Sequence, residues 1–313
     1  MKENNKVSHK SKIGGQALIE GIMMRGLDKA SMAVRKPDGE IDVETWNLKK
    51  QSIFNKIPIV RGMVNFIQSM FMGYKCLSKS AEKAGIDDDE NYEPSKFEKW
   101  LDDKLGDKLM GVITIVGTVL GVILSFLLFM YLPSLLVKGL DVLIPIGAFK
   151  ALIEGIIKIM IFIIYLSLVG KMKEIRRVYE YHGAEHKTIF CYENGLPLTV
   201  ENVKIQSRFH PRCGTSFIII VLILSILIFS VVTWSSIWMR TLIKLALLPI
   251  VVGIAYELIK VAGRYDNWLT RIISYPGIKL QNLTTCEPDD SQIEVAIAAM
   301  EAVIPDNKED DQW

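Results

Sequence analysis

The apolar residues of this chain are concentrated in four long segments, which set the expected architecture. The segments cover residues 109–137, 151–170, 215–239 and 242–262, and the first and third contain no charged residue. Each is long enough to cross the roughly 30 Å of hydrocarbon in a bilayer as a helix. The pattern therefore predicts a mainly α, polytopic helical membrane protein with about four transmembrane helices, built from residues 97–270. We expect Pro133 to end the first span.

The residues before the first span predict a small β unit followed by an amphipathic helix. Residues 40–46 alternate between apolar and polar side chains after the turn signal Lys-Pro-Asp-Gly at 36–39, which is typical of a hairpin. Residues 13–48 are therefore interpreted as the β unit. Residues 52–84 carry apolar side chains at helical spacing, with an interruption near Pro58. This helix lies either in the core or in the headgroup region of the membrane.

The residues after the last span predict a strand and a further helix. Residues 277–285 are interpreted as a strand that could join the N-terminal sheet. Ser-Gln-Ile-Glu at 291–294 is interpreted as a capping box that begins an amphipathic helix. Together, residues 13–96 and 271–304 are expected to form a small cytoplasmic α+β part. The two polar ends of the chain are expected to be disordered over residues 1–12 and 305–313.

The distribution of charge predicts which side of the membrane each segment occupies. Lysine and arginine are frequent in residues 171–212 and 260–279, so the positive-inside rule places both termini and a histidine-rich loop at 171–213 on the cytoplasmic side of the cell membrane. The N-terminus lacks the apolar core of a signal peptide, and the four cysteines have no paired spacing, which agrees with a reducing compartment. The net charge of +2 argues against a nucleic-acid partner and leaves membrane lipids as the expected partners.

Three of the four histidines lie within residues 181–213, between the second and third spans. We expect the helix of the second span to continue to about Glu193, where a stop signal follows. On such a helix His182, Glu185 and His186 project from one face, because residues three and four apart are neighbours. This His-x-x-Glu-His order is the inverted form of a zinc-peptidase motif, in which two imidazoles bind zinc and the glutamate is the general base.

A metal ion at this motif needs at least one further ligand, for which His210 and Cys213 are the nearest candidates. If both join the two histidines, the zinc site is closed and structural. If only three residues bind, a position stays open for water and Glu185 can act as the base. Glu193 and Glu257 are additional candidates for the site. The alternative without a metal is a surface helix whose histidines pair with neighbouring glutamates as ordinary hydrogen-bonding groups.

Four blocks of sequence carry a family resemblance. They are Gly-Gly-Gln-Ala-Leu-Ile-Glu-Gly-Ile-Met-Met-Arg-Gly at 14–26, Tyr-His-Gly-Ala-Glu-His-Lys at 181–187, His-Pro-Arg-Cys-Gly-Thr-Ser-Phe at 210–217 and Leu-Gln-Asn-Leu-Thr-Thr-Cys-Glu-Pro at 280–288. Together, and in order along residues 13–303, they resemble the YqhQ-like family of bacterial multi-pass membrane proteins. The resemblance implies a membrane protein with a candidate metal site and supplies no substrate. The residues that carry over are His182, Glu185, His186, His210 and Cys213.

Two functions of different kinds follow from these residues. The first is a metal-dependent hydrolase embedded in the membrane, in which zinc is bound by the two motif histidines and by His210 or Cys213. Its location favours a lipid-linked or membrane-peptide substrate. The second is a non-catalytic scaffold or assembly factor with a structural metal site. A third hypothesis, a small transporter that uses the intramembrane acids Glu154 and Glu257, is disfavoured because the chain contains no internal repeat.

Overall fold

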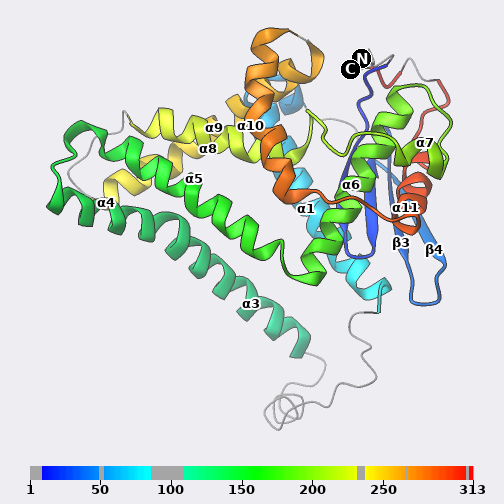
Figure 1. Ribbon diagram of the computed structural model, residues 1–313, viewed down its shortest axis with the longest axis horizontal. Helices are drawn as coiled ribbons and strands as arrows, with labels where there is room; N and C mark the ends of the chain where they lie inside the picture. Colours follow the sequence, from blue (N-terminus) through cyan, green and yellow to red (C-terminus); the bar gives the residue numbers. More distant parts are fainter. Residues whose placement is uncertain are drawn as a thin grey trace. The chain divides into compact units, whose positions relative to one another are not determined.

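The computed structural model describes residues 9–48, 53–85, 109–230, 237–265, 267–307 and 310–312. The chain divides into two compact units, one formed by residues 1–87 and 166–313 and the other by residues 88–165. The described residues are mainly helical, with one small antiparallel sheet near the N-terminus (Figure 1). The predicted fold class, a mainly α chain with apolar helices and a small sheet, is confirmed.

The N-terminal β unit is a four-stranded antiparallel meander in which each strand pairs with the next. Its strands are β1 (Gly14–Leu18), β2 (Gly21–Arg25), β3 (Lys29–Arg35) and β4 (Ile41–Asn47). The predicted hairpin joins β3 to β4, and Gly39 in its turn has a positive φ of 88°, which glycine adopts without a steric cost. The structure therefore contains the β unit that residues 13–48 predict.

Helices cover both faces of this sheet, because the apolar side chains of β2 and β3 alternate between two hydrophobic clusters. One cluster joins the sheet to α6 (Lys173–Glu193) and α11 (Asp290–Glu301), and its buried members include Ile22, Met24, Ala33, Tyr181, Ala184, Ile293 and Met300 (Figure 1). The other joins the sheet to α1 (Val60–Lys83) through Leu18, Met23, Met32, Val34 and Cys76. A slip of one residue would exchange the two sets of side chains, so this packing fixes the register.

The predicted amphipathic helix at 52–84 is present, with the interruption near Pro58. A short 3-10 turn, η1 (Ile53–Lys56), precedes α1. The buried positions of α1 include Gly73 and Cys76 on the side of the sheet, whereas Phe71 is 73% exposed. The helix thus packs against the protein with one face and presents apolar side chains on another.

Three described helices are long and apolar enough to cross a membrane, and they cover Val116–Leu143, Lys150–Val169 and Leu242–Arg264. The elements involved are α3 (Leu109–Phe126), η3 (Leu127–Tyr131), α4 (Leu132–Leu143), η4 (Gly147–Phe149), α5 (Lys150–Val169) and α9 (Ile237–Arg264). A fourth apolar helix, α8 (Gly214–Ser230), has 17 residues. The predicted span at 215–239 is therefore described only in part, because residues 231–236 lie outside the described ranges.

Pro133 does not end the first apolar helix, contrary to the prediction. A π-helical turn, η3, precedes it, and the helix continues through α4 to Leu143. In a regular α-helix a proline ring collides with the carbonyl group four residues earlier. The wider π-helical turn is a common way to accommodate an irregularity within a helix, so the chain continues instead of stopping.

The second span and the helix that carries the histidines are two helices, not one as predicted. Helix α5 ends at Val169, and α6 begins at Lys173 after the extended residue Met172. Gly170 occupies the break, where a Cβ atom would lie 3.1 Å from the ring of Tyr179. The end of α6 at Glu193 agrees with the prediction.

The predicted strand at 277–285 is wrong, because these residues belong to helix α10 (Trp268–Thr284). Pro276 and Gly277 lie inside the helix. Gly277 packs against α8, and a Cβ atom there would lie 2.6 Å from Cα of Ser216. Packing between α10 and α8 thus overrides the local signal for a turn followed by a strand. The capping box of α11 is also displaced from its predicted position and is formed by Asp289 and Gln292.

The chain ends are ordered where the structure describes them, although both were predicted to be disordered tails. Ser11 forms a β-bridge with Gln312, and the main-chain N–H of Lys12 donates to the carbonyl oxygen of Asp311 at 2.7 Å. The hydroxyl group of Tyr192 donates to the carboxylate of Asp311 at 3.1 Å. The two ends are therefore tied to each other and to the end of α6. A short helix, α7 (Val200–Lys204), follows α6.

Candidate metal centre

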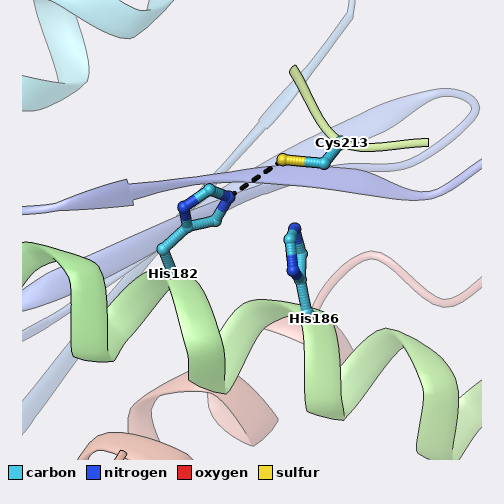
Figure 2. Close-up of side chains that lie close together, drawn as sticks. All are labelled: His182, His186 and Cys213. Atoms are coloured by element: carbon cyan, nitrogen blue, oxygen red, sulfur yellow. Dashed lines mark hydrogen bonds between the residues drawn. The ribbon is translucent and has the colours of Figure 1, made fainter. Parts of the chain in front are cut away.

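Helix α6 presents His182, Glu185 and His186 on one face, as their spacing requires. Cys213 faces the two histidines from the loop that precedes α8 (Figure 2). Nε2 of His182 lies 3.1 Å from Sγ of Cys213. One ligand atom from each of His182, His186 and Cys213 lies within 4.8 Å of the others, an arrangement that could hold one metal ion. Two segments far apart in the sequence thus converge on one point.

Main-chain carbonyl groups orient both imidazoles. Nδ1 of His182 lies 2.8 Å from the carbonyl oxygen of Thr284, and Nδ1 of His186 lies 2.6 Å from that of Arg208. A carbonyl oxygen only accepts hydrogen bonds, so each Nδ1 carries a proton and donates it. Nε2 is left as the nitrogen that can bind a metal in both rings. Histidine ligands of metal sites are held in this way by an outer hydrogen-bond acceptor.

The environment of His186 fits a metal ion. Its Nε2 atom is buried and has no hydrogen-bond partner among the described residues. A buried polar atom without a partner costs about 1–3 kcal/mol, and a bound ion would remove that cost. Two imidazoles and one thiolate are the ligand types that zinc prefers. The donor set therefore fits a zinc-type divalent ion.

The charges of the cluster favour the form of Cys213 that binds metals. Burial raises the pKa of the Cys213 thiol, but the adjacent imidazoles of His182 and His186 outweigh burial and hold this pKa well below its usual value. Burial opposes protonation of His182, yet the Cys213 sulfur raises the pKa of this imidazole to about 9. The lowered pKa of Cys213 favours its thiolate, which is the form that binds metals.

Glu185 lies beside the ligands and beneath strand β1. Its side chain is buried, and Gly15 leaves the room for it: a Cβ atom at position 15 would lie 2.9 Å from Cδ of Glu185. Burial raises the pKa of Glu185 above its usual value, against the lowering effect of the two histidines. A carboxylate with a raised pKa is a stronger base than an exposed glutamate, which suits it to accept a proton.

His210 is close to the cluster but lies outside it. Its ring centroid is 5.6 Å from that of His186, and its Nε2 lies 3.7 Å from the carboxylate of Glu193. The side-chain amide of Gln281 holds its main chain, accepting from the N–H at 2.8 Å and donating to the carbonyl at 2.7 Å. Burial lowers the pKa of His210 to about 4, so the ring is neutral at pH 7. The structure thus gives Cys213, not His210, as the third member of the metal cluster.

The two additional candidates, Glu193 and Glu257, also lie elsewhere. Glu193 is buried, pairs with Arg212 and accepts from the main-chain N–H of Ser11 at 2.7 Å. Burial opposes its ionisation, but His210 and Arg212 outweigh this and lower the pKa of Glu193. Glu257 lies on α9, where Nε of Arg61 donates to it at 2.6 Å.

Sequence reasoning missed the groups that orient the histidines. The carbonyl oxygens of Thr284 and Arg208 belong to the main chain, so residue type carries no signal for them. Gly183 is a second example, because the carbonyl group of Cys286 lies directly against its Cα and leaves no room for a side chain. The blocks 14–26 and 280–288, singled out by resemblance, do supply groups next to the site.

The fold and the site define a mainly helical protein whose described residues include three candidate membrane spans and a His/His/Cys cluster that could hold a metal ion. The family model described as "Protein of unknown function (DUF1385)" matches residues 57–306, and the chain belongs to this family. The chain is similar to "Uncharacterized protein YqhQ" of Bacillus subtilis (strain 168), with 35% identity over 298 residues that cover 93% of this chain and 92% of the relative. The expected resemblance to YqhQ-like proteins is confirmed. No solved structure matches the chain.

Proposed function

We propose that the protein is a metal-dependent hydrolase of the cell membrane in which His182, His186 and Cys213 hold a divalent ion, with zinc the best fit. The observation that carries this proposal is the buried Nε2 atom of His186, which has no hydrogen-bond partner in the described part of the chain. Ligand atoms of His182, His186 and Cys213 all lie within 4.8 Å of one another. Buried nitrogen acceptors are almost always satisfied in folded proteins. A metal ion satisfies this one.

The number of ligands favours catalysis over a purely structural role. Structural zinc sites are closed by four protein ligands, whereas catalytic sites use three and keep one position for water or substrate. When bound, such an ion supplies Lewis acidity and lowers the pKa of water to about 7. Glu185, buried beside β1 and the two histidines, would then serve as the general base, because burial raises the pKa of this carboxyl group and so makes it a stronger base than an exposed glutamate.

The location of the cluster favours a substrate from the membrane surface. Cys213 immediately precedes the apolar helix α8, and Thr284 ends α10, which packs on α8. The substrate class that suits this position is a lipid-linked molecule or a membrane peptide. The basic segments 171–212 and 260–279 support a cytoplasmic position for the site and both termini.

Elemental analysis of the purified full-length protein, prepared without chelator, tests the metal. The wild type is expected to contain about one divalent ion per chain, and His186→Ala is expected to lose it, because a three-ligand site seldom survives as a two-ligand site. His210→Ala is the matched control, since this ring lies next to His186 but outside the cluster, and it should retain the ion. A wild type without stoichiometric metal, or equal loss in both variants, would contradict the proposal.

The hydrogen bonds of His182 and His186 to main-chain carbonyl groups favour a second candidate function, a scaffold with a structural metal. They tie α6 to the loop at Arg208 and to the end of α10 at Thr284, so an ion at the cluster would clamp three segments. Glu185→Gln extends the same experiment to separate the two. If the variant keeps the ion but fails to complement a strain that lacks the gene, Glu185 acts in catalysis. If it keeps the ion and complements fully, the scaffold is correct.

A further inference from the structure

A cavity of about 340 Å³ is lined in part by His210, whose ring lies 5.6 Å from that of His186 in the candidate metal centre. It is lined by five separate segments: the N-terminal segment, the end of α6, the loop before α8, the end of α9 and the first half of α10. The cavity is therefore formed only in the folded unit. Neither His182 nor Cys213 lines it, so it is a site of its own beside the candidate metal centre.

The lining of the cavity is basic. Lys10, Arg212 and Arg271 contribute to it, and Glu193 is the acidic residue among the described residues that line it. The charge of Glu193 is taken up by Arg212, which pairs with it directly. Nζ of Lys10 donates to the main-chain carbonyl groups of Gly263 and Arg264, which holds the ammonium group at the cavity without neutralising it. An anion is the ligand that such a lining attracts.

The cavity lies at one end of a candidate membrane span, where the headgroups of a bilayer are expected. Ala262 and Gly263, which line it, are the two residues before Arg264, where the candidate span Leu242–Arg264 ends. Helix α10 begins directly afterwards and exposes Trp268, Ile272 and Tyr275 by 73%, 58% and 60%. These positions share one helical face, and Trp and Tyr are enriched at the interface between hydrocarbon and water. The exposed face is typical of a helix that lies in that interface.

The apolar part of the lining distinguishes a lipid from a small free anion. The aromatic rings of Phe190, Tyr265 and Tyr275 and the side chain of Ile278 line the same cavity as the basic groups. Tyr275 belongs at once to the cavity and to the exposed face of α10. A path of apolar surface thus leads from the cavity onto the face that would meet the acyl chains.

We propose that this cavity binds the phosphate-bearing headgroup of an anionic glycerophospholipid, with Lys10 and Arg271 contacting the phosphate and the acyl chains lying along the exposed face of α10. Arg212 is a positioning residue, because its charge is engaged by Glu193 and its guanidinium also donates to the carbonyl oxygen of Ser11 at 2.9 Å. The proposal does not depend on a metal, since the lipid contacts none of the metal cluster.

Equilibrium binding of a fluorescent short-chain phosphatidylglycerol to the full-length protein in neutral detergent tests the proposal. Arg271→Gln and Lys10→Gln should each weaken binding about ten-fold, as expected for the loss of one charge-assisted hydrogen bond. Lys29→Gln is the control, because Lys29 is an exposed base on β3 that does not line the cavity. Its affinity should stay within about two-fold of the wild type, since a distant exposed charge contributes little.

Competition on the wild type keeps the test independent of how the variants fold. Unlabelled phosphatidylglycerol should displace the probe, whereas phosphatidylcholine and free glycerol 3-phosphate should fail at the same concentration. The proposal would be overturned if phosphatidylcholine or glycerol 3-phosphate displaced the probe equally well, or if Lys29→Gln weakened binding as much as the cavity variants do. Binding is measured with metal present and after chelation, and the two affinities should agree, so that failure of the metal proposal and failure of the lipid proposal remain distinguishable.

Discussion

Two main-chain carbonyl groups determine how the histidines of the candidate metal centre are held. Because Thr284 and Arg208 contribute carbonyl oxygens, no substitution of their side chains removes the contact directly. What orients His182 and His186 is instead the path of the backbone at the end of α10 and in the loop before α8. The metal centre is thus sensitive to changes that shift these segments, even where no ligand is altered.

At this scale, we expect His210 to make the stability of the protein depend on pH. Its pKa is lowered by burial from 6.5 to about 4, so the unfolded chain binds a proton more readily than the folded one between these values. The groups that face the ring are Glu193, Arg212 and His186. Stability should be unaffected by this group above pH 6.5 and should fall as the pH decreases from 6.5 towards 4.

Thermal unfolding of the purified protein in detergent, measured across this pH range, checks the expectation. His210→Gln should flatten the dependence between pH 6.5 and 4, because glutamine cannot be protonated there. The pKa of Glu193 is also lowered, so this carboxylate reduces the stability of the protein only at lower pH, where it becomes protonated. If the melting temperature of His210→Gln falls with pH as steeply as that of the wild type, other groups cause the pH dependence.

The sequence spacing of the site residues predicts which side chains share a helix face. It does not predict how close residues from different segments lie to one another. His182, Glu185 and His186 could be placed on one face because the geometry of a helix fixes their relation. His210 and Cys213 could both be proposed as ligands, but their two-residue separation does not say which one faces the helix. The contact of His210 with Gln281, 71 residues later, decides the matter, and such a long-range contact has no local signal.

At the scale of elements, glycines set how closely α1 and α9 approach. A Cβ atom at Gly62 would lie 2.7 Å from Cβ of Tyr256, and one at Gly253 would lie 2.5 Å from the carbonyl oxygen of Ile59. Glu257 on α9 also pairs with Arg61 on α1 and accepts from the main-chain N–H of Ile59 at 3.3 Å. Small residues and an ion pair therefore join these two helices.

We expect Gly253→Ala to destabilise the protein by about 1–3 kcal/mol, because the added methyl group meets main-chain atoms that cannot move aside separately. Gly121→Ala is the matched control, since it is also a helical glycine and a Cβ atom there has nothing within 4 Å. That variant should be neutral or slightly stabilised through helix propensity. Unfolding in detergent, monitored by circular dichroism, measures both, and equal stability of the two variants would show that the crossing tolerates the methyl group.

Elements with local signals could be predicted, and those decided by packing could not. The hairpin of β3 and β4 follows from its turn residues, and the interruption before α1 follows from Pro58. The Pro276-Gly277 pair is also a local turn signal. It nevertheless lies inside α10, because Gly277 allows that helix to pack against Ser216 of α8. A glycine required by a neighbouring helix and a glycine required by a turn look alike in one sequence.

At the scale of the whole molecule, the buried core constrains the number of membrane crossings. The sheet, α6 and α11 share one hydrophobic cluster, so all three lie on the same side of any membrane. The chain must then cross an even number of times between α6 and α11. The helices available there are α9, a candidate span, and the shorter apolar helix α8. We therefore expect α8 to cross together with α9, which gives the four spans that the hydropathy predicts.

Labelling of introduced cysteines in intact cells with a membrane-impermeant maleimide tests this count. Ile144→Cys, after α4, and Ser235→Cys, between α8 and α9, should be labelled from outside. Glu201→Cys, on α7, should react only after the membrane is permeabilised. The parent protein gives the background, which should be low because three of its four cysteines are buried. If position 235 reacts on the same side as position 201, α8 does not cross.

The order of the segments along the chain has a consequence for synthesis. The strands precede the candidate spans along the chain and are made before them, while α11, which covers the apolar face of the sheet at Ile22, Met24 and Ala33, is made only after residue 289. The candidate membrane helices are therefore made before α11 can pack against the sheet. During that interval the exposed apolar face of the sheet must be covered by a chaperone or by the bilayer, and a chain that ends before α11 would keep this face exposed.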